Sequence, residues 1–266
     1  EMLRIVISFV VAFAAAALGG KGLIPLLRRM KAGQSIKEIG PTWHMSKQGT
    51  PTMGGLMFII GSAAAVLLLG WPDFAAGRFG GGFVLLFGVI GYIDDYVKVK
   101  KHQNTGLTAP QKFLLQLAAA IVFTVLMRNH HYLTPDLYIP FVNVTLSLPW
   151  PVYMVFAAFV MVGTVNAVNI TDGIDGLATG VTMPVMLFFT AVACFWGQLE
   201  LGIFSAGLFG GLCGFLIYNF HPAKVFMGDT GSLFLGGAVC GLAFALDIPL
   251  VLILVGIIYI LETLSD

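Results

Sequence analysis

The stretch LGIFSAGLFGGLCGFLIY (201–218) decides the fold class of this chain. It contains no charged side chain, and an α-helix of its length and composition can span the hydrocarbon core of a bilayer. Similar runs recur along the 266 residues, of which 58% are hydrophobic and only 10% are charged. An ordinary soluble domain has about 25% charged residues. The composition therefore excludes a disordered chain, a disulfide scaffold and a typical soluble enzyme, and it indicates a polytopic membrane protein.

The apolar segments predict an all-α polytopic integral membrane protein with nine visible spans. They leave no room for a separate soluble domain, so residues 1–266 are predicted to form a single transmembrane domain. Cys194, Cys213 and Cys240 lie inside apolar runs and are interpreted as packing residues. The predicted spans are Met2–Leu27, Thr52–Gly70, Gly82–Tyr96, Pro110–Met127, Pro151–Val168, Gly176–Trp196, Leu201–Tyr218, Ser232–Leu246 and Pro249–Leu264.

Lysine and arginine predict the orientation of these spans. Ten of the fourteen basic residues fall in three segments: Arg28–Pro51, Val97–Lys112 and Asn219–Thr230. The positive-inside rule places these segments in the cytoplasm and the N-terminus outside. The net charge of +1 gives no indication of nucleic-acid binding.

The segment Asn129–Trp150 then lies on the outer side of the membrane. Its stretches Tyr138–Val142 and Val144–Leu148 are joined around Asn143. Two short β-prone runs that flank a turn residue predict a short periplasmic β-hairpin.

Five acidic residues are predicted to lie at the opposite, cytoplasmic edge of the membrane. Because the orientation comes from basic residues alone, their clustering at the cytoplasmic membrane edge is an independent observation. Carboxylate oxygens suit a hard cation such as Mg²⁺, so the pattern predicts a Mg²⁺-phosphate site. These acids come from three separate segments and are Asp94, Asp95, Asp172, Asp175 and Asp229.

Asp94 and Asp95 end the third predicted span in GYIDDYVK (91–98). Adjacent carboxylates near a helix C-terminus oppose the helix dipole and repel each other, which makes a purely structural role a poor explanation. Lys98 follows Asp94 by four residues and shares its helical face, as a phosphate ligand or a carboxylate partner.

Asp172 and Asp175 lie in NAVNITDGIDGLA (166–178). One interpretation is structural, because Asp before a helix is a good N-cap and glycine permits the turn. Two acids with Asn166 and Asn169 just upstream exceed what capping requires. We therefore predict a binding role for at least one of the two acids, helped by a helix N-terminus that favours an anion.

Asp229 lies in NFHPAKVFMGDTGS (219–232). Asp229 or Ser232 could simply cap the following helix. The loop contains more polar and aromatic side chains than a cap requires, since it also includes Asn219, Lys224 and Phe226. Phe226 is either a membrane-interface aromatic or a platform on which a base stacks.

The first inner loop carries KQGTPTMGG (47–55). It is either ordinary loop chemistry before a Thr-capped helix or a phosphate cradle at a helix N-terminus. His44, His102 and His221 are interpreted as interfacial, because none has a second ligand at metal spacing.

Together these strings resemble the phospho-N-acetylmuramoyl-pentapeptide transferase (MraY) family, the bacterial lipid I synthases. The resemblance runs in order along nearly the whole chain. The Asp-Asp and Asp-Gly-x-Asp-Gly motifs are shared by the wider polyprenyl-phosphate N-acetylhexosamine-1-phosphate transferase superfamily, whereas Lys47–Gly55 and Thr-Asp-Gly are more typical of the muramoyl branch. The strings are GTPTMGG (49–55), DDYVK (94–98), APQKF (109–113), NAVNITDGIDGLA (166–178) and MGDTGS (227–232).

The resemblance implies ten transmembrane helices in the bacterial inner membrane, with the active site on the cytoplasmic side. The implied reaction moves phospho-MurNAc-pentapeptide from its UDP carrier to undecaprenyl phosphate, requires Mg²⁺ and yields lipid I and UMP. Inhibition by nucleosides such as tunicamycin is a further expectation. Glycine-rich outer surfaces fit a homodimer.

The resemblance also implies roles for individual residues. Asp94, Asp95 and Asp229 would be catalytic, Asp229 would coordinate Mg²⁺, and Asp94 would lie near the attacking lipid phosphate. The residues implied to bind substrate or nucleotide are Lys47, Thr52, Lys98, Lys112, Asn169, Ile170, Asp172, Gly173, Asp175, Asn219, Phe226 and Gly228.

One departure concerns the end of the chain. The family has a His-His-His motif in a cytoplasmic loop after the ninth helix, followed by a tenth helix. This chain ends at Asp266, ahead of that loop. We expect the corresponding residues to be missing from the chain.

The nucleophile implied by the resemblance is a phosphate monoester, which is already largely anionic at neutral pH. It needs little help from a base, and the difficulty is to bring two anions together. We therefore favour direct in-line attack, with a two-step route through an aspartyl phosphate as the alternative.

Two other functions stay open from the sequence. A sister transferase that uses UDP-GlcNAc would share the aspartates and Mg²⁺. A secondary transporter would instead place functional acids near the bilayer midplane on broken helices.

Overall fold

The computed structural model describes residues 1–30, 32, 49–70 and 75–265. These residues are mostly helical, as predicted for a polytopic helical membrane protein. The helices are α1 (Met2–Arg29), α2 (Leu56–Leu69), α3 (Ala75–Lys101), α4 (Ala109–Asn129), α5 (Trp150–Thr171), α6 (Leu177–Phe195), α7 (Leu199–Asn219), α8 (Gly228–Ala245), α9 (Leu252–Val255) and α10 (Ile257–Ser265), with a 3₁₀ turn, η2, at Pro249–Val251.

Within the described ranges, six helices are long and apolar enough to cross a membrane: α1, α4, α5, α6, α7 and α8. Helix α2 is apolar but shorter, at 14 residues. The chain is therefore a multi-pass membrane protein, and the count of nine spans stays a prediction.

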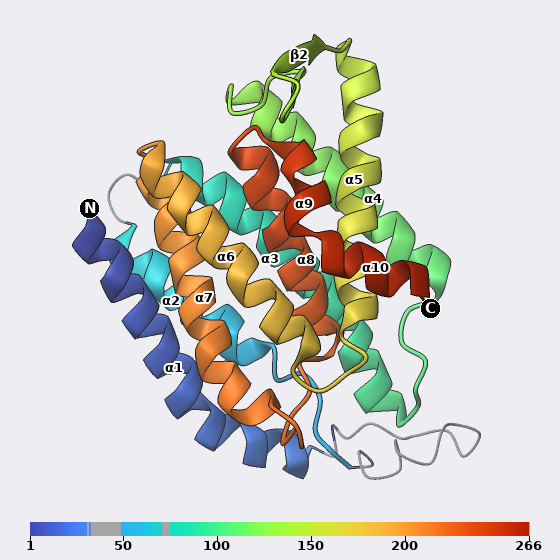
Figure 1. Cartoon of the computed structure of the whole chain (residues 1–266). Helices are drawn as coiled ribbons and strands as arrows, with labels where there is room; N and C mark the ends of the chain where they lie inside the picture. Colours follow the sequence, from blue (N-terminus) through green and yellow to red (C-terminus); the bar gives the residue numbers. More distant parts are fainter. Residues whose placement is uncertain (31, 33–48, 71–74, 266) are drawn as a thin grey trace.

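Helix α8 forms the centre of the bundle and is buried from Thr230 to Phe244. It packs between α3 and α5, while α1, α2, α6 and α7 pack against one another beside it (Figure 1). Glycines allow these close approaches. Gly91 of α3, for example, lies against the backbone of Asp229 at the start of α8. A residue near the start of α8 is therefore held by direct backbone contact with α3.

The predicted hairpin is confirmed, but its strands are shorter and shifted. Strand β1 is Asp136–Ile139 and β2 is Val144–Ser147, paired antiparallel with Ile139 opposite Val144. The prediction extended the first strand to Val142. That end is wrong because Pro140 follows Ile139 and has no N–H to donate to a ladder.

The last predicted span, Pro249–Leu264, is also wrong as a single helix. The segment divides into η2, α9 and α10, and the α-helical path breaks at Gly256, which has φ −94° and ψ 9°. A side chain at residue 256 would lie 2.5 Å from the Leu252 carbonyl oxygen, so glycine permits this break. Helix α10 then crosses α5 (Figure 1).

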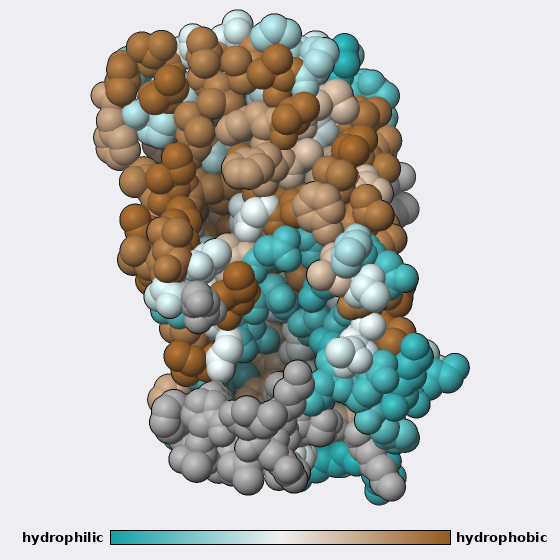
Figure 2. Space-filling model, turned by 90° about the vertical axis from the view of Figure 1, so that its right-hand side faces the viewer, coloured by the Kyte–Doolittle hydropathy of each residue, from teal (hydrophilic) through white to brown (hydrophobic). Residues whose placement is uncertain are grey.

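The two ends of the bundle differ in character. The hairpin lies at one end, and the loops that follow α3, α5 and α7 lie at the other (Figure 1). Figure 2 shows hydrophobic residues over the upper part of one face and hydrophilic residues gathered in its lower half. The acids that the sequence places at one membrane edge lie at this hydrophilic end.

Candidate active site

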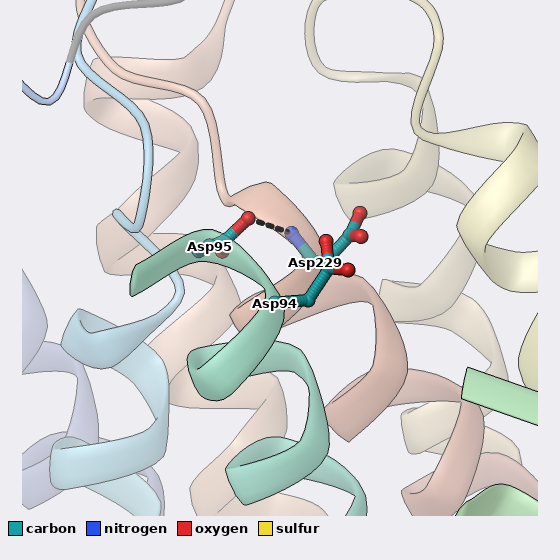
Figure 3. A group of neighbouring side chains, drawn as sticks. All are labelled: Asp94, Asp95 and Asp229. Atoms are coloured by element: carbon teal, nitrogen blue, oxygen red, sulfur yellow. Dashed lines mark hydrogen bonds between the residues drawn. The ribbon is translucent and has the colours of Figure 1, made fainter. Parts of the chain in front are cut away.

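Within the described part of the chain, three carboxylates come together from two helices. Asp94 and Asp95 lie about two turns before the end of α3, which continues past the predicted end at Tyr96 to Lys101, and Asp229 lies in the first turn of α8 (Figure 3). One oxygen from each lies within 4.8 Å of the others. Asp94 and Asp95 are buried, each with 2% of its surface exposed. The structure therefore brings together residues separated by more than 130 positions, as the membrane-edge pattern predicts.

Lys98 bridges all three carboxylates. Its Nζ lies 2.5 Å from Asp94 Oδ2, 3.1 Å from Asp229 Oδ2 and 3.8 Å from Asp95 Oδ1. The predicted i,i+4 pair of Asp94 and Lys98 is thus present. The ammonium group marks a position where a cation contacts all three acids.

Lys112 of α4 contacts Asp229 as well. Its Nζ donates to Asp229 Oδ2 at 2.7 Å, so that one oxygen accepts from two ammonium groups. The start of α4 is fixed locally by a capping box, in which Thr108 and Gln111 bond each other's backbone N–H. Lys112 follows Gln111 directly, and its N–H closes the first turn by donating to the Thr108 carbonyl at 2.9 Å, so the capped turn fixes where its side chain begins.

Asn169 of α5 holds the other oxygen of Asp229. Its amide nitrogen donates to Asp229 Oδ1 at 2.9 Å and to Ser232 Oγ at 2.7 Å. Ser232 is fully buried on α8. The sequence motif indicates Ser232 only as a helix cap; its position three residues after Asp229 is the clue to this second contact.

The loop after α3 folds back onto Asp94. The Leu107 N–H donates to Asp94 Oδ1 at 2.8 Å. Gly106 approaches the same carboxyl so closely that a side chain there would lie 2.5 Å from Asp94 Oδ1. Asp94 Oδ1 therefore has a fixed hydrogen-bond donor in Leu107, whereas Asp94 Oδ2 forms an ion pair with Lys98.

Asp95 points toward the backbone of α8 instead. Its Oδ1 accepts from the Asp229 N–H at 3.2 Å, and its Oδ2 accepts from the Thr230 N–H at 2.8 Å and from Thr230 Oγ1 at 2.7 Å. Thr230 is not among the predicted site residues.

The segment 51–55 lies along residues 225–227 and closes one side of the site. The Phe226 N–H donates to the Pro51 carbonyl, and the Gly54 and Gly55 N–H groups donate to the carbonyls of Phe226 and Met227, at 2.8–3.0 Å. The two glycines thus permit close backbone packing. Thr52 faces Gly228, whose added side chain would lie 2.6 Å from Thr52 Oγ1. Lys47 lies outside the described residues.

Asp172 and Asp175 do not cap α6, because the N-cap of that helix is Gly176, which has no side chain and a φ of +74°. The capping interpretation is therefore wrong. Asp172 is the C-cap residue of α5. Asp175 Oδ2 contacts His221 Nδ1 at 3.0 Å and accepts from the Ala223 N–H at 3.1 Å. Asp175 thereby ties the loop after α5 to the loop after α7.

The remaining predicted residues lie around the same end. Asn219 is buried; its Oδ1 accepts from Thr179 Oγ1 at 2.7 Å, and its Nδ2 donates to the Val225 carbonyl at 3.1 Å. Phe226 is half-buried. The exposed Ile170 and Gly173 lie at the end of α5 and in the loop after it.

A partly buried amide pair lies one turn below the acids, and its member Gln116 was not among the predicted residues. Asn166 Nδ2 donates to Gln116 Oε1 at 2.8 Å, between α5 and α4. Gln116 follows Lys112 by one helical turn and is fully buried. A lone glutamine inside the apolar run of α4 is the sequence clue to this contact.

The donor set fits a hard cation. Mg²⁺ takes oxygen ligands and is usually held by one or two carboxylates together with water and substrate phosphates. Asp94 and Asp229 offer such oxygens at the position that the Lys98 ammonium group contacts. Three carboxylates against two ammonium groups also leave a formal charge of −1, which an added cation would offset.

Comparison with known proteins gives two family matches in this chain. Residues 79–247 match Glycosyl transferase family 4, and residues 47–59 match phospho-N-acetylmuramoyl-pentapeptide-transferase signature 1. The first match contains Asp94, Asp95, Asp229 and both lysines of the cluster.

Curated relatives named phospho-N-acetylmuramoyl-pentapeptide-transferase match nearly the whole chain. The Clostridium acetobutylicum protein is 45% identical over 98% of this chain and 82% of its own length. The Caldanaerobacter subterraneus protein is 43% identical over the same shares. The Staphylococcus aureus protein is 45% identical over 91% of this chain and 77% of its own. On this evidence the chain belongs to the phospho-N-acetylmuramoyl-pentapeptide-transferase family.

Proposed function

We propose that this protein transfers phospho-MurNAc-pentapeptide from UDP-MurNAc-pentapeptide to undecaprenyl phosphate and so makes lipid I and UMP for peptidoglycan synthesis. The observation that carries the proposal is the pairing of Asp94 with Asp229, bridged by Lys98 and joined by Lys112 and Asn169. The curated relatives bear the name of this transferase.

The arrangement suits the chemistry of two phosphates that must meet. When bound, Mg²⁺ would supply positive charge that draws the phosphate oxygens together and stabilises the leaving nucleotide. Asp94 and Asp229 are the residues that would hold it. Lys98 and Lys112 are positioned to neutralise phosphate charge, and Asn169 keeps Asp229 Oδ1 turned in a fixed direction.

Direct in-line attack by the lipid phosphate fits this geometry better than a route through an aspartyl phosphate. Asp94 Oδ1 accepts from the Leu107 N–H, and Asp94 Oδ2 contacts Lys98. With Oδ1 held by a hydrogen bond and Oδ2 against the Lys98 ammonium group, we assign Asp94 to orienting the lipid phosphate or accepting its proton. The lipid phosphate is itself largely anionic at neutral pH.

The proposed location follows from the same site. We place the protein in the bacterial inner membrane, with the N-terminus outside and the acids at the cytoplasmic face. There, a soluble nucleotide donor and a lipid phosphate held at the bilayer surface can both reach them. The segment 51–55, Phe226 and Gly228 would contribute to the donor site, and nucleoside inhibitors such as tunicamycin would compete there. A homodimer is part of the proposal.

The test compares two donors. Purified full-length protein in detergent receives undecaprenyl phosphate and either UDP-MurNAc-pentapeptide or UDP-GlcNAc, with and without Mg²⁺, and released UMP is measured. We expect Mg²⁺-dependent release from the muramoyl donor only. Release from UDP-GlcNAc only would assign the protein to the sister branch of the superfamily, and no release from either donor by folded protein would contradict the proposal.

Replacing Lys112 tests the phosphate-binding side of the site. Lys112→Gln is expected to lower kcat/KM by about a hundredfold, because one charged partner of the reacting phosphates is lost. The matched control is Lys100→Gln on α3, whose ammonium group lies over the Tyr96 ring, 5.9 Å from its centroid, and not among the acids. The control should keep kcat/KM within twofold, and equal losses in both variants would show that general surface charge is responsible.

A further inference from the structure

The N-terminus of α8 lacks a cap of its own. The first turn of any helix leaves backbone N–H groups without partners in the helix, and a side-chain oxygen at the N-cap usually accepts from the second or third of them. The N-cap of α8 is Met227, whose thioether supplies no such oxygen. Asp229 and Thr230 carry the second and third N–H groups of this helix.

Asp95 of α3 supplies the missing acceptor. It accepts from the Asp229 N–H and the Thr230 N–H, which are the two groups that an N-cap side chain serves. The Thr230 hydroxyl adds a third donor, at 2.7 Å from Asp95 Oδ2. Gly228 makes room for this contact, because a side chain there would lie 2.5 Å from Asp95 Oδ2.

Asp94 and Asp95 therefore face in different directions. Figure 3 shows the carboxyl groups of Asp94 and Asp229 side by side, while Asp95 turns back to the Asp229 backbone. The Lys98 ammonium group also lies closer to Asp94 than to Asp95, at 2.5 Å from Asp94 Oδ2 and 3.8 Å from Asp95 Oδ1. The oxygens of Asp95 already carry three hydrogen bonds from α8.

We propose that Asp95 is a positioning residue: it caps α8 from the neighbouring helix and, with Thr230, holds Asp229 in place, while Asp94 and Asp229 face the reacting phosphates. The division of catalytic roles rests on the proposed function. The cap itself does not, and it is tested without any substrate.

Hydrogen–deuterium exchange on the full-length protein, without Mg²⁺, tests the cap. In Asp95→Asn, an NH₂ group replaces one of the two accepting oxygens and the other becomes a neutral, weaker acceptor, so exchange of the amides at 229 and 230 should become about tenfold faster. Asp94→Asn is the matched control, because it changes the adjacent carboxylate and leaves the cap intact; its exchange at these amides should stay within twofold of the wild type.

Activity separates positioning from direct participation. Thr230→Val removes only the hydroxyl donor, and kcat should fall about tenfold while KM for both substrates stays within twofold. Thr230→Ser keeps the donor and should restore kcat. Thr124→Val is the control, since the Thr124 hydroxyl bonds only the Ala120 carbonyl of its own helix in the described structure. The double variant of Asp95→Asn and Thr230→Val should be no worse than Asp95→Asn alone.

Two results would overturn the proposal. One is exchange at 229 and 230 that is equally fast in Asp95→Asn and Asp94→Asn. The other is that Thr230→Val is as active as Thr124→Val while Asp95→Asn is inactive. If Asp95→Asn does not fold, amide exchange and kcat of Thr230→Val and Thr230→Ser test the proposal instead. An inactive wild type with the predicted exchange pattern would contradict the proposed function and leave the cap supported.

Discussion

Asp229→Asn is expected to lower kcat by about a thousandfold or more, the largest loss among the single substitutions considered. The Asp229 carboxylate accepts from Lys98, Lys112 and Asn169 at once. An amide in its place loses the negative charge that pairs with both lysines and offers Mg²⁺ at most a neutral oxygen. The measurement is the rate of UMP release with saturating donor and acceptor.

Asp136→Asn is the matched control for that substitution. Asp136 is an acid on the hairpin, at the far end of the bundle, where its carboxyl is bonded to the Ser147 hydroxyl. Its replacement should leave kcat within twofold. An Asp229→Asn protein that folds and keeps more than a tenth of wild-type activity would show that Asp229 is not at the reacting centre.

Gly91→Ala is expected to have the largest effect on stability. An added methyl at residue 91 would lie 2.5 Å from the carbonyl carbon of Asp229 and 2.8 Å from the nitrogen of Thr230. Both are backbone atoms, so the clash cannot be relieved by turning a side chain. Overpacking usually costs about 1–3 kcal/mol, and the rigid surroundings here place this substitution at or beyond the upper figure.

The readouts for Gly91→Ala are the thermal unfolding midpoint in detergent and the rate of UMP release, and both should fall together. Gly163→Ala on α5 is the control, because no heavy atom within the described residues lies within 4 Å of its added methyl. A Gly91→Ala protein that unfolds at the same temperature as Gly163→Ala would contradict the close packing of α3 on α8.

The sequence alone predicts the class of fold and the convergence of the acids. Hydrophobic runs require bilayer helices, and the distribution of lysine and arginine assigns one edge to Asp94 and Asp229 before any distance is known. The pairing of Asp94 with Lys98 also follows from helical geometry, because it is a local i,i+4 relation.

Contacts between helices are what the sequence leaves undetermined. The direction of the Asp95 carboxylate depends on how α8 sits against α3, and the partnership of Asn169 with Ser232 depends on the rotation of α5. An apolar sequence without a regular repeat does not determine how a helix is rotated about its own axis against its neighbours. The motifs therefore indicate Asp95 as a site residue, which the resemblance implies to be catalytic, but they do not show which way its carboxylate faces.

The structural roles of individual glycines are also left undetermined by the sequence. In the sequence, Gly54 and Gly55 fit a phosphate cradle or an ordinary loop, and the structure shows them packed against the backbone at 226–227. The break at Gly256 was missed because hydropathy continues across it without change. Local composition predicts that a segment is apolar, but not whether it stays one straight helix.

The transfer of the phospho-sugar itself tests the central claim most directly. Full-length protein would be given UDP-MurNAc-pentapeptide labelled with ³²P in its β-phosphate, together with undecaprenyl phosphate and Mg²⁺, and the label in the lipid extract would be compared with the UMP formed. The account predicts label in the lipid in a one-to-one ratio with UMP in the wild type, and neither product in Asp229→Asn. UMP without labelled lipid would indicate a hydrolase, and unchanged label transfer in Asp229→Asn would remove the acid cluster from the reaction.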